Sequence, residues 1–352
     1  MASIFDTTPD YRRLTEVLTG KKADRIPIYE FFSDPNIQME AIDNNNLPDP
    51  SNLGNDEELN TLIRNQYYLG YDYLPANVDL NFSGLTGLQS MDSEGNIRYF
   101  LDEQHNAITS REDMEKYPWP KPEDLSYHRI EYCSKYAPEG MKVVANLGGG
   151  LFEWGTWLMG TENFCLKIYE DPDFIKDFLK RVNDQQVAAA SESAKHEDVI
   201  AVILGDDLGF KTQTFLPPAI LKEYIFPGLK RVCDAVHNEG KPFILHSCGY
   251  LNDVMDDLID FVGIDAKHSY EDVITPVTKA KELWGDRIAL LGGVDVDFLC
   301  RADESSLRAY VRNIMEKCGD KGFALGSGNS IANYVPPKSL RIMNEEAIMC
   351  QM

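Results

Sequence analysis

The stretch that decides the fold joins the end of a predicted helix to a buried strand: His237-Asn-Glu-Gly-Lys-Pro-Phe-Ile-Leu-His246. Gly240 is expected to stop the helix, because glycine readily adopts the left-handed conformation that closes a helix C-terminus. The apolar run after it is short and unbroken, which is typical of a strand covered on both faces of a parallel sheet. Residues 237–246 therefore predict one helix-to-strand junction of an α/β protein.

Similar junctions recur along the chain. Apolar residues with helical spacing, such as Phe174, Ile175 and Phe178, or Leu307, Val311 and Ile314, alternate with short apolar runs. Eight such runs predict strands at residues 25–32, 71–75, 142–147, 199–205, 241–246, 261–268, 288–295 and 322–327. Eight strand-helix units favour a closed (β/α)8 TIM barrel over an open doubly wound sheet.

We expect a single domain over residues 1–352 with an insertion near residues 81–122. Within it, Asp92-Ser-Glu-Gly-Asn96 separates two strand-like pieces and predicts a hairpin. The following Tyr117-Pro-Trp-Pro-Lys-Pro122 predicts a stiff extended segment. The insertion would follow the second strand and could cover the barrel mouth.

Composition narrows the class of protein and of partner. The chain of 352 residues has a net charge of −23, which would repel phosphate backbones and anionic lipid, so we expect no nucleic acid and no membrane partner. No apolar stretch approaches the roughly 20 residues of a membrane helix, and the start lacks the pattern of a signal peptide. The seven cysteines are scattered, without the spacing of a disulfide framework. We therefore expect a cytoplasmic protein with free thiols.

Active sites of barrels lie at the carboxyl ends of the strands, so polar residues at those ends are candidates. The candidates are Asp206, Asp207, His246, Cys248, Lys267, His268, Asp295, Asp297, Ser327, Asn329 and Asn333. Among these, His246 and Cys248 are two apart, and alternation along an extended strand puts both side chains on one side. Nitrogen and sulfur are the ligands that zinc favours, and a catalytic zinc keeps about three protein ligands.

Several of these motifs together resemble one enzyme superfamily. They are Gly205-Asp-Asp-Leu-Gly209, His246-Ser-Cys-Gly249, Gly263-Ile-Asp-Ala-Lys267, Leu291-Gly-Gly-Val-Asp295 and Gly326-Ser-Gly-Asn-Ser330. The chain resembles the uroporphyrinogen decarboxylase superfamily over nearly its whole length, and within it the methylcobamide-dependent methyltransferases. The resemblance implies a TIM barrel, and a zinc held by His-x-Cys and a later cysteine. It also implies a small-molecule methyl donor or acceptor, and a separate corrinoid protein that carries the methyl group.

His246 and Cys248 match the first two zinc ligands that the resemblance implies, residue for residue. The later cysteine is replaced in this chain. Where it would fall, at the end of the last strand, the chain has Ser327, a poor zinc ligand. Glu223 or Asp207 could supply an oxygen ligand instead. We assign Glu223 to the metal set with His246 and Cys248, and we assign Asp207 and His268 to catalysis.

Five further residues are assigned to the substrate: Asp206, Lys267, Asp295, Ser327 and Asn329. Each assignment has a structural alternative. The His-x-Cys pair could be packing, and Asp206-Asp207 could cap a helix. Lys267-His268 could form a salt-bridged rim, and Gly326-Ser-Gly-Asn329 could simply close the barrel.

Cobalamin is expected on a partner rather than on this chain. The segment Asp234-Ala-Val-His-Asn-Glu-Gly240 is similar to the Asp-x-His-x-x-Gly cobalamin motif, but one extra residue separates Asp from His.

Two other functions stay open, a metal-independent decarboxylase and a non-catalytic small-molecule binding barrel. The arginine signature of true uroporphyrinogen decarboxylases is not visible, because Tyr11-Arg-Arg-Leu14 continues as an ordinary helix face. The sequence also leaves the number of subunits open, and a homo-oligomer is one of the alternatives.

Overall fold

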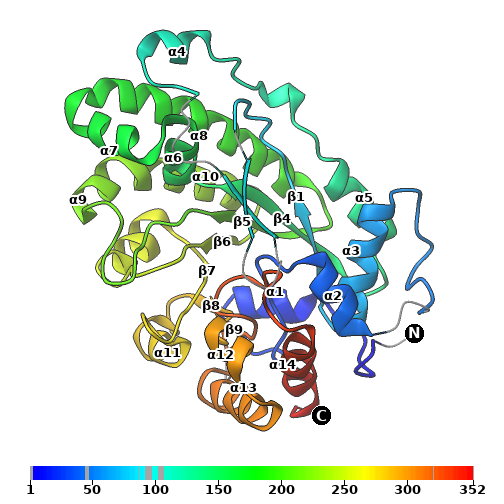
Figure 1. The fold of residues 1–352 in the computed structure, drawn as a ribbon. Helices are drawn as coiled ribbons and strands as arrows, with labels where there is room; N and C mark the ends of the chain where they lie inside the picture. Colours follow the sequence, from blue (N-terminus) through cyan, green and yellow to red (C-terminus); the bar gives the residue numbers. More distant parts are fainter. Residues whose placement is uncertain are drawn as a thin grey trace.

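A curled parallel sheet forms the centre of the protein. The computed structural model describes residues 3–43, 47–85, 87–91, 97–101, 107–319 and 321–351. Seven strands are hydrogen-bonded in the order β1-β4-β5-β6-β7-β8-β9, and helices surround them (Figure 1). The strands are β1 (Tyr73–Asn77), β4 (Lys142–Gly149), β5 (Val199–Gly205), β6 (Phe243–His246), β7 (Ala266–His268), β8 (Ala289–Leu291) and β9 (Phe323–Ala324).

Helices connect and cover these strands. The α-helices are α1 (Arg12–Leu18), α2 (Pro35–Ile42), α3 (Glu57–Tyr68), α4 (Arg111–Lys116), α5 (His128–Tyr136), α6 (Leu151–Met159), α7 (Thr161–Glu170), α8 (Pro172–Lys195), α9 (Pro218–Ile220), α10 (Phe226–His237), α11 (Val277–Trp284), α12 (Val296–Arg301), α13 (Glu304–Cys318) and α14 (Pro337–Met349). Short 3-10 or π segments are η1 (Pro122–Asp124), η2 (Leu221–Ile225) and η3 (Asp257–Val262). Within the described residues, no helix is long and apolar enough to cross a membrane.

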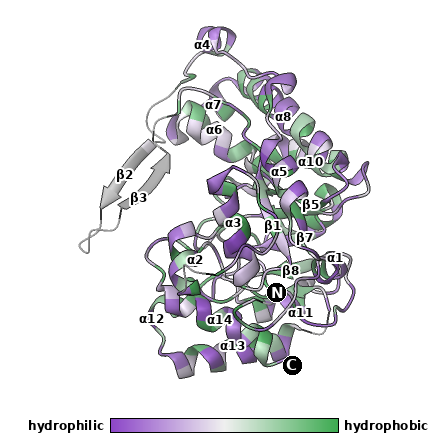
Figure 2. Ribbon diagram, turned by 90° about the vertical axis from the view of Figure 1, so that its right-hand side faces the viewer, coloured by the Kyte–Doolittle hydropathy of each residue, from purple (hydrophilic) through white to green (hydrophobic). Residues whose placement is uncertain are grey.

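The helix-to-strand junction predicted from the sequence is confirmed. Helix α10 ends at His237, and Gly240 has a φ of +70°, the left-handed conformation expected there. All four residues of β6 are buried. Figure 2 shows hydrophobic and hydrophilic residues alternating along α10 and α13, and the buried residues of α13 include the predicted Leu307, Val311 and Ile314. One face of each helix therefore packs on the protein interior.

The first of the eight predicted strands, residues 25–32, is not a strand. Ile28 forms an isolated parallel bridge with Leu325, beside β9. Pro27 accepts a hydrogen bond from the Leu325 N–H at 3.0 Å but has no N–H to extend the ladder. On its other side, this segment is joined to β1 through Tyr73, whose hydroxyl bonds the backbone of Glu30. The described residues thus form a TIM-barrel-like sheet of seven strands, without the predicted eighth strand or its backbone closure.

The predicted insertion contains a second, small sheet. Strands β2 (Gly87–Met91) and β3 (Ile97–Leu101) pair in antiparallel fashion, as the hairpin prediction required. The predicted turn, Asp92–Asn96, lies outside the described residues. After the hairpin, the hydroxyl of Tyr117 exchanges hydrogen bonds with the backbone of Ser83, which fastens the proline-rich segment to the start of the insertion.

Strand register brings the candidate site together. Gly205 of β5 pairs with His246 of β6, and His246 pairs with His268 of β7. Because the strands are parallel, their carboxyl ends meet at one edge of the sheet. The polar residues that follow β5, β6 and β7 therefore lie next to one another.

Candidate metal centre

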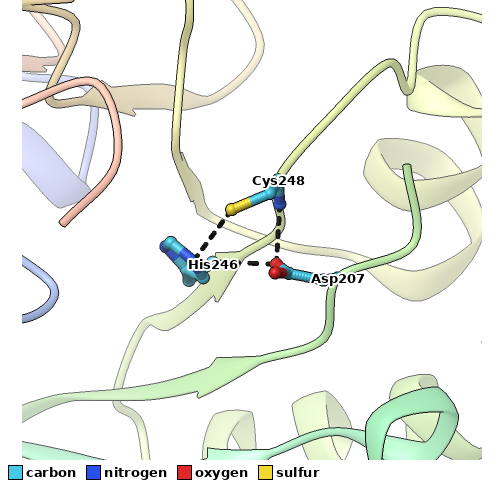
Figure 3. A group of neighbouring side chains, drawn as sticks. All are labelled: Asp207, His246 and Cys248. Atoms are coloured by element: carbon cyan, nitrogen blue, oxygen red, sulfur yellow. Dashed lines mark hydrogen bonds and ion pairs between the residues drawn. The ribbon is translucent and has the colours of Figure 1, made fainter. Parts of the chain in front are cut away.

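Three side chains at the carboxyl edge of the sheet point toward one another (Figure 3). Asp207 follows β5, His246 ends β6 and Cys248 follows it by two residues. The Nε2 atom of His246 lies 3.4 Å from the sulfur of Cys248 and 3.7 Å from Oδ1 of Asp207. Among the described residues, this is the one group of at least three His, Cys, Asp or Glu residues whose ligand atoms all lie within 4.8 Å of one another.

The spacing of these atoms suits a zinc ion. Tetrahedral zinc with bonds of about 2.0–2.3 Å keeps a nitrogen and a sulfur ligand about 3.6 Å apart, and a nitrogen and an oxygen about 3.4 Å apart. The separations in this protein are 3.4 Å and 3.7 Å. The donor set also fits, because imidazole, thiolate and carboxylate are all zinc ligands. Three protein ligands would leave one position for substrate.

The imidazole of His246 is fixed in orientation by two neighbours. The ring of Phe31 stacks on it with a centroid separation of 3.9 Å, and Nδ1 of His268 lies 2.7 Å from Nδ1 of His246. A proton carried on Nδ1 of His246 leaves the Nε2 lone pair free to face Cys248 and Asp207. Burial, followed by His268 and Lys267, lowers the pKa of His246 well below its usual value, so the ring is neutral, as a metal ligand must be.

Cys248 lies among hydrogen-bonding groups. Its backbone N–H donates to Oδ1 of Asp207 at 2.9 Å, and its sulfur accepts from Nδ2 of Asn329 at 3.2 Å and from the Ser269 hydroxyl at 3.7 Å. Burial and the charge of Asp207 raise the pKa of the Cys248 thiol well above its usual value. A divalent cation acts in the opposite direction and favours the thiolate.

Two glycines allow the loops after β5 and β6 to approach closely. Gly249 has a φ of +82°, and a Cβ on it would lie 2.3 Å from the backbone carbon of Gly209. A Cβ on Gly209 would lie 2.6 Å from the carbonyl oxygen of Cys248. Only residues without a side chain fit at this crossing, which sets Cys248 against Asp207.

Glu223, assigned to the metal set from the sequence, is not in this group. It lies on η2 with more than half of its side chain exposed and forms an ion pair with Lys176 at 3.2 Å. Asp207, the other carboxylate considered as an oxygen ligand, takes its place. The sequence shows both carboxylates, but it does not show that η2 turns Glu223 outward.

Two predicted substrate residues act as helix caps in this structure. The carboxylate of Asp206 is fully buried and accepts from the N–H groups of Phe152 and Glu153 at the start of α6. The carboxylate of Asp295 accepts from the N–H of Phe298 at the start of α12. Aspartate is among the residues preferred at helix N-termini, where its carboxylate accepts hydrogen bonds from the free backbone N–H groups. Asp297, the other acid of that segment, pairs with Arg301 on the surface.

The remaining predicted residues surround the group. Lys267 is 3% exposed, and its Nζ donates to the Ser269 carbonyl at 2.6 Å. Burial lowers the pKa of Lys267 to about 8. His268 is fully buried, with a pKa that burial lowers to about 3, and its Nδ1 shares a hydrogen bond with Nδ1 of His246. The placement of His268 behind His246 suits orientation of that ring.

Two acidic residues outside the sequence-predicted set border the site. Glu30 is buried, and its carboxyl group accepts from both the N–H and the hydroxyl of Ser327; burial raises the pKa of Glu30 to about 8. Glu153 lies in the first turn of α6, where burial and then Asp207 and Asp206 raise its pKa well above the usual value. An acid inside an otherwise apolar run, as in Ile28-Tyr-Glu-Phe-Phe32, was the available signal for Glu30.

Residues 103–348 match the family described as "Uroporphyrinogen decarboxylase (URO-D)", well over half of the chain. This protein belongs to the uroporphyrinogen decarboxylase family. Among solved structures, the chain is similar to a methyltransferase from Methanosarcina mazei, with a TM-score of 0.69, 15% identity and full coverage of both chains. That likeness shows a shared fold. A B12-independent methionine synthase from Shewanella sp. W3-18-1 gives a TM-score of 0.49 at 11% identity, over 95% of this chain and 97% of that one. No curated protein matches the sequence.

Proposed function

We propose that this member of the uroporphyrinogen decarboxylase family is a zinc-dependent methyltransferase. It would move a methyl group between a small methylated compound and a separate corrinoid protein. The observation that carries the proposal is the convergence of Asp207, His246 and Cys248 at the carboxyl edge of the sheet. The fold shared with the Methanosarcina mazei methyltransferase supports it.

The donor set indicates which kind of methyl compound suits the site. Zinc bound there would act as a Lewis acid toward the heteroatom that carries the methyl group. Asp207, His246 and Cys248 supply one oxygen, one nitrogen and one sulfur, so the site contains less thiolate charge than one with two cysteines. A harder, more acidic site favours an ether oxygen over a thiol, and we therefore propose O-demethylation.

The protein residues divide into ligands and supports. His246 presents its neutral Nε2, while Phe31 and His268 hold the ring in place. Asp207 as a ligand is not free to move a proton, and His268 lies behind His246, so neither suits the catalytic role assigned from the sequence. The substrate would bind on the open side of the group, where Asp207 is 44% exposed.

We also propose that cobalamin reaches the site on its partner. The segment that resembles a cobalamin motif makes structural contacts at the amino ends of the strands, away from the candidate metal centre. There, Nε2 of His237 lies 2.7 Å from Asp265, just before β7, and Asp234 pairs with Lys230 at 2.7 Å. In this structure Nε2 of its histidine is hydrogen-bonded to Asp265, which supports placing cobalamin on the partner.

The metal assignment is tested by elemental analysis of purified wild type and of His246→Ala, Cys248→Ala, Asp207→Asn and Glu223→Gln. We expect about one zinc per chain in the wild type, and a loss of zinc in the first three variants. Glu223→Gln is the matched control and should keep its zinc, because its side chain faces solvent and Lys176.

Activity is measured in the same proteins as methyl transfer from methoxylated aromatic compounds to cob(I)alamin in solution. Chelation of the wild type should abolish the transfer. Zinc-free wild type together with unchanged transfer in His246→Ala would refute the proposal.

A metal-independent decarboxylase is the second candidate, favoured by the family description itself. The basic residues with which such an enzyme would hold substrate carboxylates would have to reach the carboxyl edge of the sheet. Arg13 and Arg25 instead both pair with Asp72, which precedes β1, at 2.9 Å and 3.0 Å. Decarboxylation that persists in chelator and in Cys248→Ala would support this candidate. Ligand retention without any turnover would favour a binding barrel.

A further inference from the structure

Three loops meet at the sulfur of Cys248. Asn329, in the loop after β9, places its Nδ2 3.2 Å from that sulfur. The same nitrogen lies 3.3 Å from Oε1 of Glu271, in the loop after β7. Asn329 is a predicted substrate residue, but its amide nitrogen is engaged by the protein.

The direction of the Asn329 amide follows from its partners. The NH2 group of asparagine has two hydrogens, and a carboxylate and a thiolate are both acceptors. Turning the amide over would place its oxygen against Glu271 and Cys248, where like partial charges repel. Glu271 therefore fixes the amide with one N–H directed at the sulfur.

We propose that Asn329, oriented by Glu271, is a positioning residue that donates a hydrogen bond to the Cys248 thiolate and so weakens its electron donation to the metal. The proposal rests on the metal centre of the proposed function. Hydrogen bonds to a ligand sulfur tune the bound metal, and groups that orient a ligand often matter nearly as much as the ligand. A hydrogen-bonded single thiolate keeps the metal more acidic toward an ether oxygen.

A second contact to the same sulfur comes from Ser269, directly after β7. Ser269 has a φ of +87°, which is uncommon for a residue with a side chain. Its carbonyl accepts from the buried Lys267 at 2.6 Å, and its hydroxyl lies 3.7 Å from the Cys248 sulfur. The longer distance makes Ser269 the weaker donor, so Asn329 carries the main effect.

The test uses the full-length protein with Co²⁺ in place of zinc, because a thiolate bound to Co²⁺ gives a near-ultraviolet charge-transfer band. Loss of the hydrogen bond in Asn329→Leu makes the thiolate a stronger donor and should move this band to longer wavelength. The affinity for Zn²⁺, measured by competition with a chromophoric chelator, should fall by about tenfold. This is the lower end of the loss expected when a group that orients a metal ligand is removed. Glu271→Leu should shift the band in the same direction by less.

Asn252→Leu is the matched control. The side-chain oxygen of Asn252 accepts a hydrogen bond from the Thr275 hydroxyl, and this bond does not involve the Cys248 sulfur. Its band should equal that of the wild type. Asn329→Asp, which has nearly the shape of asparagine, gives a second reading if Asn329→Leu folds poorly, and it should shift the band in the same direction as Asn329→Leu. A wild-type band in folded, Co²⁺-loaded Asn329→Leu or Asn329→Asp would overturn this inference alone. A wild-type protein that binds neither Co²⁺ nor Zn²⁺ would overturn the metal centre with it.

Discussion

At the scale of single residues, the site depends on groups held away from their ordinary state by burial. Glu30 illustrates this, because its carboxyl group accepts two hydrogen bonds from Ser327 and its pKa is still raised to about 8. Desolvation therefore outweighs the hydrogen bonds. Ser327, a predicted substrate residue, is hydrogen-bonded to Glu30 in this structure.

Glu30→Gln should change how stability depends on pH. The folded pKa of about 8 lies above the value of 4.5 expected in the unfolded chain. The folded state therefore binds more protons between these values, and the free energy of unfolding should fall as pH rises from 5 to 8. Over these three pH units the fall is at most about 4 kcal/mol, because one proton contributes at most about 1.36 kcal/mol per pH unit. Urea unfolding at both pH values should show a smaller fall in Glu30→Gln. Identical pH dependence in both proteins would argue that Glu30 is not a buried neutral acid.

At the scale of elements, loop crossings decide whether ligands on different strands meet. The sequence predicted the strand that ends in His246, and this strand is confirmed. The side chains of His246 and Cys248 do converge, with Nε2 and Sγ 3.4 Å apart, but Cys248 lies in the loop after β6 and not in the strand whose alternation was used to predict this. The sequence did not predict which carboxylate completes the group. Asp206 and Asp207 are adjacent, and only the packing of α6 shows that Asp206 caps a helix. The position of Asn329 against the sulfur likewise depends on three loops that are distant in sequence.

Gly249→Ala should disturb this crossing. A Cβ there would lie 2.3 Å from Gly209, in addition to the cost of a φ of +82°. We expect a loss of about 2–4 kcal/mol in the free energy of unfolding, and a lower affinity for Zn²⁺. Gly240→Ala is the control, because Gly240 has a φ of +70° but a Cβ added to it would meet nothing within 4 Å. It should cost about 1–2 kcal/mol and leave Zn²⁺ affinity unchanged. Equal Zn²⁺ affinities in both variants would contradict the role of the crossing.

At the scale of the whole molecule, the periodicity of the sequence predicted most of the sheet. Seven of the eight expected strands form, and the region that fails contains Pro27, which cannot donate to a ladder. Tyr73 joins that segment to β1, through a ring stacked on Tyr29 at 5.3 Å and a hydroxyl bonded to Glu30. A side chain that replaces backbone pairing has no periodic signal in the sequence. The curled sheet nevertheless places the ends of β5, β6 and β7 together, and the candidate metal centre follows from that arrangement.

Zinc K-edge X-ray absorption on the purified full-length protein tests the central claim most directly. If Asp207, His246 and Cys248 hold the metal, the spectrum should show one sulfur at about 2.3 Å, with the other ligands being nitrogen or oxygen at about 2.0–2.2 Å. The sulfur contribution should vanish in Cys248→Ser reloaded with added Zn²⁺. Two or more sulfur ligands, or a sulfur signal that survives in Cys248→Ser, would contradict the account.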